Sequence, residues 1–269
     1  MIQLNTMVKI LSLNVGAFPK IFGVLFGTTG NSNKRCEEIG NILTKNLSNI
    51  NNFDVICFQE IWSKTCFNTL VNILNHLYPY NTSFYHTCCT LGSGLIIFSK
   101  NQILSEYKED FKDFRGHGIL AHKGFLVANI KYIGYVITCH LQAGSVDWLD
   151  KLFNKTIDTK EIARRQTTQI VNHVNSFIPQ SEVVYITGDF NITYLDEEYK
   201  QFIPILTNAN FQNSTMYPPY TTTKQSGDGI IDYCFVKNAQ VSTTTSNLIP
   251  AELADHKCLV TTLIKLYSK

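Results

Sequence analysis

Short apolar runs and amphipathic segments alternate along this chain. The runs are rich in β-branched and aromatic residues, which favours strands, and they lie at residues 8–14, 54–60, 94–100, 124–132, 135–141, 182–189, 230–236 and 257–266. Apolar residues at helical spacing predict helices at 34–50, 62–77 and 159–178, the last with Asp158 as its cap, and a short helix opening at 196–198. Many apolar strands with a few helices between them predict sheets covered by helices on their outer faces, in one layered α/β or α+β domain over residues 1–269.

Polar side chains stand at the ends of several of these predicted strands. They are Asn14, Glu60, His140, the pair Asp189 and Asn191, Asp232 near the start of its run, and the pair Asp255 and His256 before the last run. Each alone is more often a cap or turn residue, and a single histidine is more often a hydrogen-bonded core residue. Strand ends that share one edge of the sheets converge in space, however, and sites are commonly built there.

The chemistry that these residue types support is narrow. Glu and Asp oxygens with an Asn carbonyl suit a hard divalent cation, most simply Mg²⁺, whereas softer metals prefer Cys or more His. An Asp paired with a His orients the imidazole and supports its protonated form, so the His can act as a general base. A second His and an Asn can donate to an oxygen that gains charge in the transition state. Together these groups predict metal-assisted hydrolysis, most naturally of a phosphoester.

Composition limits the remaining classes of protein. The 269 residues are 44% hydrophobic and 16% charged, with a mean hydropathy of −0.03, so the chain can bury a sizeable core. A formal net charge of +2 without a dense basic run does not favour nucleic acid. The eight cysteines form no CxxC pair and four of them lie in apolar runs, which favours free thiols in a reducing compartment. We expect no signal peptide or transmembrane helix, and an intracellular, cytoplasmic or peripheral-membrane location.

Six motifs together resemble the endonuclease/exonuclease/phosphatase superfamily, which has the DNase I-like fold. They are LSLN at 11–14, CFQEIW at 57–62, TCHLQA at 138–143, GDFN at 188–191, IDYCF at 231–235 and ADH at 254–256. Their order and spread cover nearly the whole chain. The resemblance implies a four-layered α/β sandwich, in which two β-sheets pack face to face with helices on both outer faces.

The resemblance also implies roles for the polar residues. Glu60 would be the main Mg²⁺ ligand, with Asn14 beside it and Asp255 in the metal or water shell, and Mn²⁺ could substitute. His256 would be the general base that Asp232 orients, His140 would donate to a phosphoryl oxygen, and Asp189 and Asn191 would position the nucleophile and the phosphate. Lys123, in HKGFLVA at 122–128, would contact the substrate; its alternative is an ordinary surface lysine.

Within the superfamily, several details are similar to the neutral sphingomyelinase branch. These are the Trp after QEI, GSGLIIFSK at 92–100, HKGFLVA, CHLQA and RRQTTQI at 164–170. The branch implies a phosphodiesterase that cleaves a phospholipid to release phosphocholine, and we expect the protein to be a monomer. A nuclease or an inositol-phosphate phosphatase on the same scaffold is the alternative, and an inactive relative that binds a partner ranks below both.

An apolar segment follows the first polar strand end. Residues 16–30, GAFPKIFGVLFGTTG, contain six large apolar side chains and one charged residue, Lys20. The segment is either core or an exposed lip beside the site, and we expect any peripheral membrane contact to be made here. Trp62 and Trp148 are expected to be core or rim aromatics.

Overall fold

The computed structural model describes residues 8–17, 31–45, 52–84, 92–114, 122–143, 159–193, 197–214, 220–222 and 229–266. Most of the apolar segment at 16–30 lies outside these residues, as do the predicted cap Asp158 and Trp148. The prediction of membrane contact through 16–30 therefore stays a prediction.

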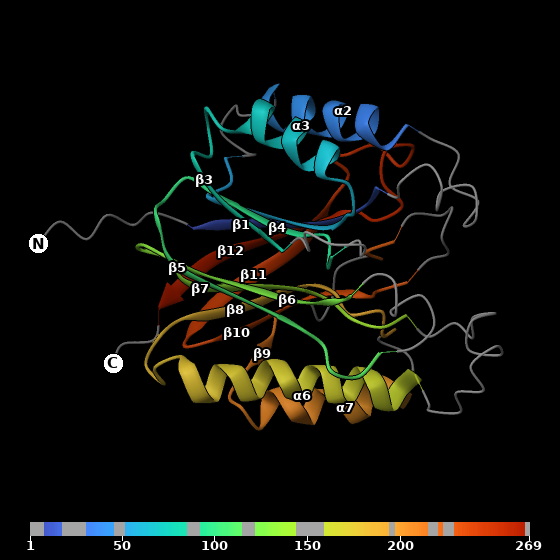
Figure 1. The fold of residues 1–269 in the computed structure, drawn as a ribbon. Coiled ribbons are helices and arrows are strands. Elements are labelled where there is room, and N and C mark those ends of the chain that lie inside the picture. Colours follow the sequence, from blue (N-terminus) through green and yellow to red (C-terminus); the bar gives the residue numbers. More distant parts are fainter. Residues whose placement is uncertain are drawn as a thin grey trace, which may run out of the picture.

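Two six-stranded β-sheets pack face to face, and a pair of helices covers each outer face (Figure 1). In strand order, the first sheet contains β11 (Ala239–Ser246), β12 (Cys258–Leu266), β1 (Lys9–Ala17), β2 (Val55–Ile61), β4 (Leu95–Ser99) and β3 (Tyr80–Phe84). The second contains β5 (Ile103–Asp110), β6 (Gly124–Ile130), β7 (Gly134–His140), β8 (Val184–Asp189), β10 (Asp232–Lys237) and β9 (Gln212–Asn213). The predicted four-layered sandwich is confirmed.

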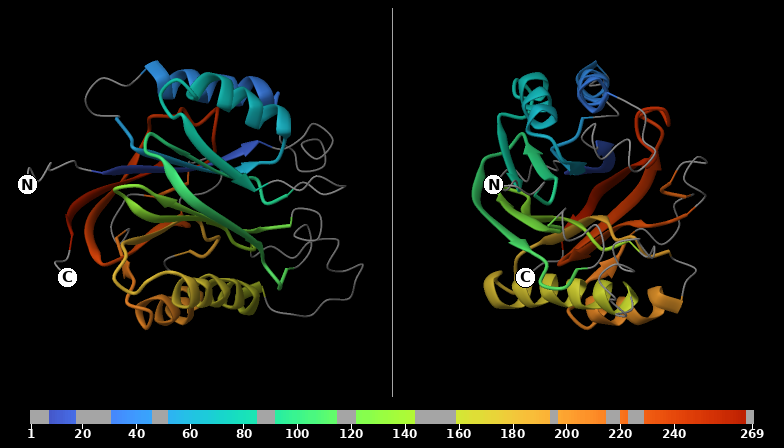
Figure 2. Two further views of the ribbon diagram at one scale, coloured as in Figure 1. Left: turned by 60° about the vertical axis from the view of Figure 1, so that its left-hand side comes forward. Right: turned by 45° about the vertical axis from the view of Figure 1, so that its right-hand side comes forward.

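The helices lie on opposite sides of the sandwich, as Figure 2 shows from two further directions. Helices α2 (Ser32–Lys45) and α3 (Lys64–Leu74) cover the first sheet, and α6 (Thr159–Phe177) and α7 (Glu197–Thr207) cover the second. The predicted start of the second helix at residue 62 is wrong, because the Ser63 side chain accepts a hydrogen bond from the Thr65 N–H and caps a helix that begins at Lys64. No helix in the described part of the chain is long and apolar enough to cross a membrane.

The apolar runs predicted eight of the strands, and the four strands that they missed are short or polar. Strands β5 and β11 lie at sheet edges, and most of their residues are exposed or half-buried. Strand β9 has only two residues, and β3 alternates between buried and partly exposed positions. An edge strand needs no continuous apolar sequence, since much of its surface meets water.

Three apolar layers hold the four structural layers together. One lies between α2 and α3 and the first sheet, one between the two sheets, and one between the second sheet and α6 and α7. The six cysteines in the described ranges are all buried free thiols, which agrees with the prediction of unpaired cysteines.

The two sheets share one connectivity. Each has a parallel pair at its centre, β1 with β2 and β7 with β8, and an antiparallel strand on either side of it, β12 and β4 in the first sheet and β6 and β10 in the second. The carboxyl ends of four parallel strands and the amino ends of four antiparallel strands therefore lie at one edge of the sandwich. All the polar strand ends singled out in the sequence belong to six of these strands, β1, β2, β7, β8, β10 and β12, or to the residues directly beside them.

The interior between the sheets becomes more polar toward this edge. Side chains two residues apart on a strand face the same side, so each strand can be followed inward in steps of two. On β1 the inward positions change from Ile10 to Ser12 to Asn14, and on β8 from Tyr185 to Thr187 to Asp189. Small hydroxyl side chains thus separate an apolar interior from the charged edge.

Gly188 permits the close approach of β7 and β8 just before the polar edge. Its φ is +146°, and a Cβ atom there would lie 2.1 Å from the backbone oxygen of Cys139. The glycine before Asp189 is therefore required by the pairing of the two strands.

We expect Gly188→Ala to destabilise the protein by roughly 3 kcal/mol, because the clash is with backbone and only a shift of β7 can relieve it. Urea unfolding measures this loss. Gly229→Ala is the matched control, since a Cβ there would meet only the Thr222 hydroxyl at 3.6 Å. Equal stability of the two variants would contradict the steric account.

Candidate active site

Asn14 joins the two sheets at the polar edge. Its amide nitrogen donates to Glu60 Oε1 at 3.0 Å and to Asp189 Oδ2 at 2.9 Å, and its Oδ1 accepts from the Gly16 N–H at 3.0 Å. Asn14 and Asp189 are almost fully buried. Asn14 thus faces both carboxylates as a donor, so its role as a metal ligand through Oδ1 stays a prediction.

Glu60 reaches this cluster through an unusual backbone conformation. The side chain of Gln59 points between the sheets, so regular alternation would turn Glu60 outward, toward the side of the sheet where α3 lies. The φ of Glu60 is instead +60°, a left-handed value that non-glycine residues seldom adopt. This turn brings its carboxylate back to Asn14. Strain of this kind is common at functional sites.

His256 and Asp232 form the shortest contact between an imidazole and a carboxylate at this edge. His256 Nδ1 lies 2.8 Å from Asp232 Oδ2, and both side chains are buried. Because a carboxylate only accepts, Nδ1 carries the proton of this hydrogen bond. The other ring nitrogen, Nε2, lies 3.9 Å from Asp189 Oδ2 and so faces the cluster. The geometry agrees with the predicted pairing of these two residues.

Lys123 and Asn191 meet at the backbone oxygen of Leu141. Lys123 Nζ donates to this oxygen at 2.7 Å, and Asn191 Nδ2 donates to it at 3.0 Å. Lys123 Nζ also lies 2.8 Å from His140 Nε2 and is buried, so the alternative of a surface lysine is wrong. Since an ammonium only donates, His140 Nε2 accepts here, and the donor at this point of the cluster is Lys123.

Burial and neighbouring charges shift the pKa values of these groups. Burial raises the pKa of Glu60, and it raises the pKa of Asp189 to about 7. Burial also lowers the pKa of Lys123 to about 8, and burial with the charge of Lys123 holds the pKa of His140 well below its usual range. Burial disfavours the charged form of His256 as well, but Asp232 outweighs it and raises the pKa of that imidazole to about 10.

We expect the cation-free protein to lose stability as the pH rises from about 3.8 to about 7, because the folded state holds the Asp189 proton more tightly than the unfolded chain does. This contribution is fully present below the unfolded pKa and is lost as the pH rises through the folded one. Asp189→Asn removes it, since an amide does not ionise.

Urea unfolding in EDTA at about pH 4 and about pH 8 measures the effect. Between the two pH values the stability of the variant should rise relative to wild type by roughly 1–3 kcal/mol. A difference between the two proteins that does not change with pH would contradict the assignment.

Asp255 and Trp62 lie at the margin of the cluster. Asp255 is exposed, and its Oδ1 lies 3.5 Å from the position that a Cβ on Gly16 would take. The indole N–H of Trp62 makes a long hydrogen bond of 3.5 Å to Glu60 Oε2, and its ring lies beside that of His140. The prediction of a core or rim aromatic is correct for Trp62, but nothing in the local sequence indicates its contact with Glu60.

A divalent cation fits the centre of this arrangement. Ligand atoms of Glu60, His140 and Asp189 all lie within 4.8 Å of one another. Two of the three are carboxylates whose pKa values are raised by burial, which disfavours their charged forms. A bound cation would offset the cost of burying these negative charges. The predicted ligand Asp255 is not part of this group, whereas His140 and Asp189, predicted as catalytic residues, are.

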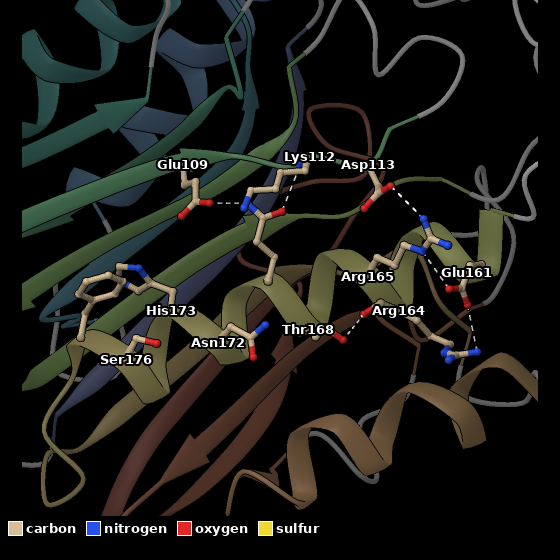
Figure 3. A pocket seen from close by; sticks show the side chains of 12 residues that line it. Glu109, Lys112, Asp113, Glu161, Arg164, Arg165, Thr168, Asn172, His173 and Ser176 are labelled. Carbon is tan, nitrogen blue, oxygen red and sulfur yellow. Dashed lines mark hydrogen bonds and ion pairs between the residues drawn. The ribbon is translucent and has the colours of Figure 1, made fainter.

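A separate hollow lies between α6 and the end of β5, with a volume of about 450 Å³ (Figure 3). None of the predicted site residues lines it. Four of its charged side chains pair with one another: Arg165 contacts both Asp113 and Glu161, and Arg164 contacts Glu161. The polar residues at the strand ends therefore form a site that is separate from this pocket.

The fold and the site together define a two-sheet sandwich with a carboxylate and imidazole centre at its strand ends. The family model described as the endonuclease/exonuclease/phosphatase family matches residues 11–256. The chain therefore belongs to that family, as the motifs predicted.

Similar proteins point to one branch of this family. The chain is 24% identical over 216 residues to a sphingomyelinase C of Listeria ivanovii, 28% over 227 residues to one of Leptospira interrogans, and 28% over 194 residues to a phospholipase C of Staphylococcus aureus. These matches cover 70%, 77% and 65% of this chain, but only 62%, 38% and 56% of the respective relatives.

Solved structures agree on the fold. The sphingomyelinase C of Streptomyces griseocarneus has a TM-score of 0.77 at 18% identity, covering 95% of this chain and 99% of that one. A Staphylococcus aureus beta toxin mutant with bound magnesium ions has a TM-score of 0.75 at 23% identity, covering 98% and 100%. At these identities the likeness establishes the shared fold.

Proposed function

We propose that this protein is a Mg²⁺-dependent phosphodiesterase of the sphingomyelinase type, which hydrolyses a phospholipid to phosphocholine and a lipid alcohol. The observation that carries the proposal is the juxtaposition of the Glu60, His140 and Asp189 cluster with the Asp232–His256 pair at one edge. The sphingomyelinase C and phospholipase C relatives support the substrate class.

Glu60 and Asp189 would hold the cation, with His140 beside them, and Mn²⁺ could take the place of Mg²⁺. When bound, the cation supplies positive charge that stabilises the phosphate and lowers the pKa of nearby groups. Asn14 fixes the distance between the two carboxylates through its two donated hydrogen bonds.

In its neutral form, which the positive charge of a bound cation would favour, His256 takes the proton of the attacking water at Nε2, while Asp232 holds the ring through Nδ1. The water oxygen forms a bond to phosphorus, and the bond from phosphorus to the lipid oxygen breaks. That oxygen takes a proton from solvent and leaves as an alcohol, while His256 releases its own proton to solvent. Lys123 donates to a phosphoryl oxygen from its position beside His140, and Asn191 lies next to it across the Leu141 carbonyl.

A substrate panel tests the proposal. Purified protein is assayed with sphingomyelin, lysophosphatidylcholine, an inositol phosphate and a DNA duplex, each with Mg²⁺ and with EDTA. We expect Mg²⁺-dependent release of phosphocholine from a choline phospholipid. Preferred hydrolysis of DNA or of the inositol phosphate would favour the alternative activities of the same scaffold, and no hydrolysis of any substrate would favour an inactive binding relative.

A further inference from the structure

We propose that Gln59 is a positioning residue, whose hydrogen bonds hold the two facing sheets in a fixed position relative to each other next to the active site. The proposal rests on the proposed function, in which groups from both sheets act together. Gln59 is fully buried, and its Nε2 donates to Ser12 Oγ at 3.1 Å and to Thr138 Oγ1 at 2.8 Å.

The partners of Gln59 connect it to three strands of the site. Ser12 lies two residues before Asn14 on β1, and Thr138 lies two residues before His140 on β7. Since residues two apart on a strand face the same side, each hydrogen bond fixes the strand position that carries the next site residue. Gln59 itself precedes Glu60 on β2, so one side chain links the backbones that carry Asn14, Glu60 and His140.

The link crosses between the sheets. Ser12 and Gln59 belong to the first sheet, and Thr138 belongs to the second. The proposed cation site crosses the same interface, because Glu60 comes from the first sheet whereas His140 and Asp189 come from the second. A shift of one sheet against the other would therefore change the distances among the cation ligands. Such misplacement weakens cation binding and slows catalysis without removing any ligand.

Stability alone does not account for a glutamine at this position. The side chains that point between the sheets farther from the active site, such as Ile10 and Val136, are apolar and belong to the core between the sheets. Within the described residues, no donor reaches Gln59 Oε1, so only one end of the buried amide is paired by protein. An unbranched apolar side chain of similar size would fill the same space without burying an amide.

The test uses Gln59→Met and Thr138→Val, which remove the two ends of the link while keeping side-chain volume. We expect each variant to lower kcat on a choline phospholipid by roughly 10- to 100-fold with a KM within about threefold of wild type, and to weaken Mn²⁺ binding by about tenfold. The double variant should have a kcat and a Mn²⁺ affinity only slightly lower than those of either single variant, because both substitutions break the same contact. Electron paramagnetic resonance of free Mn²⁺ measures the affinity independently of turnover.

Ile97→Val is the matched control, since Ile97 is buried in the same interface on β4 but is not part of the link. This variant should keep the kcat and the Mn²⁺ affinity of wild type, while its Tm falls by a few degrees. If Gln59→Met fails to fold, Ser12→Ala and Thr138→Val decide the question.

Several results would overturn the proposal. They are kcat and Mn²⁺ affinity within about twofold of wild type in the folded link variants, equal losses in Ile97→Val, or fully additive losses in the double variant. If wild type hydrolyses no substrate of the panel, the proposed function fails, but the Mn²⁺ affinities still decide the role of Gln59. A wild type that binds no Mn²⁺ would overturn both.

Discussion

Replacing His256 with alanine is expected to lower turnover of a choline phospholipid by roughly 10²- to 10⁴-fold in the presence of Mg²⁺. The reason is the position of its imidazole: Nδ1 is hydrogen-bonded to Asp232 Oδ2 at 2.8 Å, and Nε2 faces the cluster, with Asp189 Oδ2 at 3.9 Å. The other imidazole of the site, His140, is not placed in this way, because its Nε2 accepts from Lys123.

Steady-state kinetics on a short-chain soluble phospholipid checks this prediction, with circular dichroism as the test of folding. His76→Ala is the control, since His76 is exposed and lies outside the site. Asp232→Asn should also lower kcat, because it removes the charge that raises the pKa of His256. Turnover of His256→Ala within tenfold of wild type, in a folded protein, would show that another group serves as the base.

Replacing Glu60 with glutamine should abolish tight cation binding and lower turnover by at least roughly 10²-fold. Glutamine keeps the shape of the side chain but removes the charge, and Glu60 is the one carboxylate that the first sheet contributes to the Glu60, His140 and Asp189 cluster. The fold should persist, because burial raises the pKa of this carboxyl and an uncharged side chain is therefore tolerated.

Isothermal titration with Mg²⁺ and an assay of phosphocholine release measure the two effects of Glu60→Gln. Glu161→Gln is the control, since it removes a carboxylate that lies on α6 and pairs there with Arg164 and Arg165. An unchanged Mg²⁺ affinity in Glu60→Gln would mean that the cation is held elsewhere, and the assignment of this cluster as the cation site would be wrong.

The location of the site could be predicted from the sequence because a change from apolar to polar residues marks where a buried strand ends. An apolar run that stops at a polar residue, as at Asn14 or Asp189, signals both a buried strand and the edge where it ends. Once the parallel pairing of β1 with β2 and of β7 with β8 is known, these ends must meet. The motifs added the roles, and the pairing of Asp232 with His256 agrees with them.

The details that escaped the sequence depend on backbone conformation and on contacts between distant strands. Nothing in the local sequence shows that Glu60 adopts a φ of +60°, or that Asn14 faces two carboxylates with its nitrogen. Gln59 stands in a quoted motif, but only the packing of the two sheets reveals its bond to Thr138. The signal that could have identified it is a polar side chain inside a buried strand, at a position that faces between the sheets and directly precedes Glu60.

The same limit explains the edge strands. The sequence of β11, AQVSTTTS, has only two apolar residues, and pairing with β12 makes it a strand. Local propensity is weak at such positions, and tertiary context decides.

The most direct test of the central claim is the release of phosphocholine from sphingomyelin by the purified protein. The claim is that the edge where the two parallel strand pairs meet hydrolyses a phosphodiester with a divalent cation. The account predicts release with Mg²⁺, none above background with EDTA, recovery when Mg²⁺ is restored, and a loss of roughly 10²-fold or more in His256→Ala under the same conditions. Equal release with EDTA, or equal release by a folded His256→Ala, would contradict it.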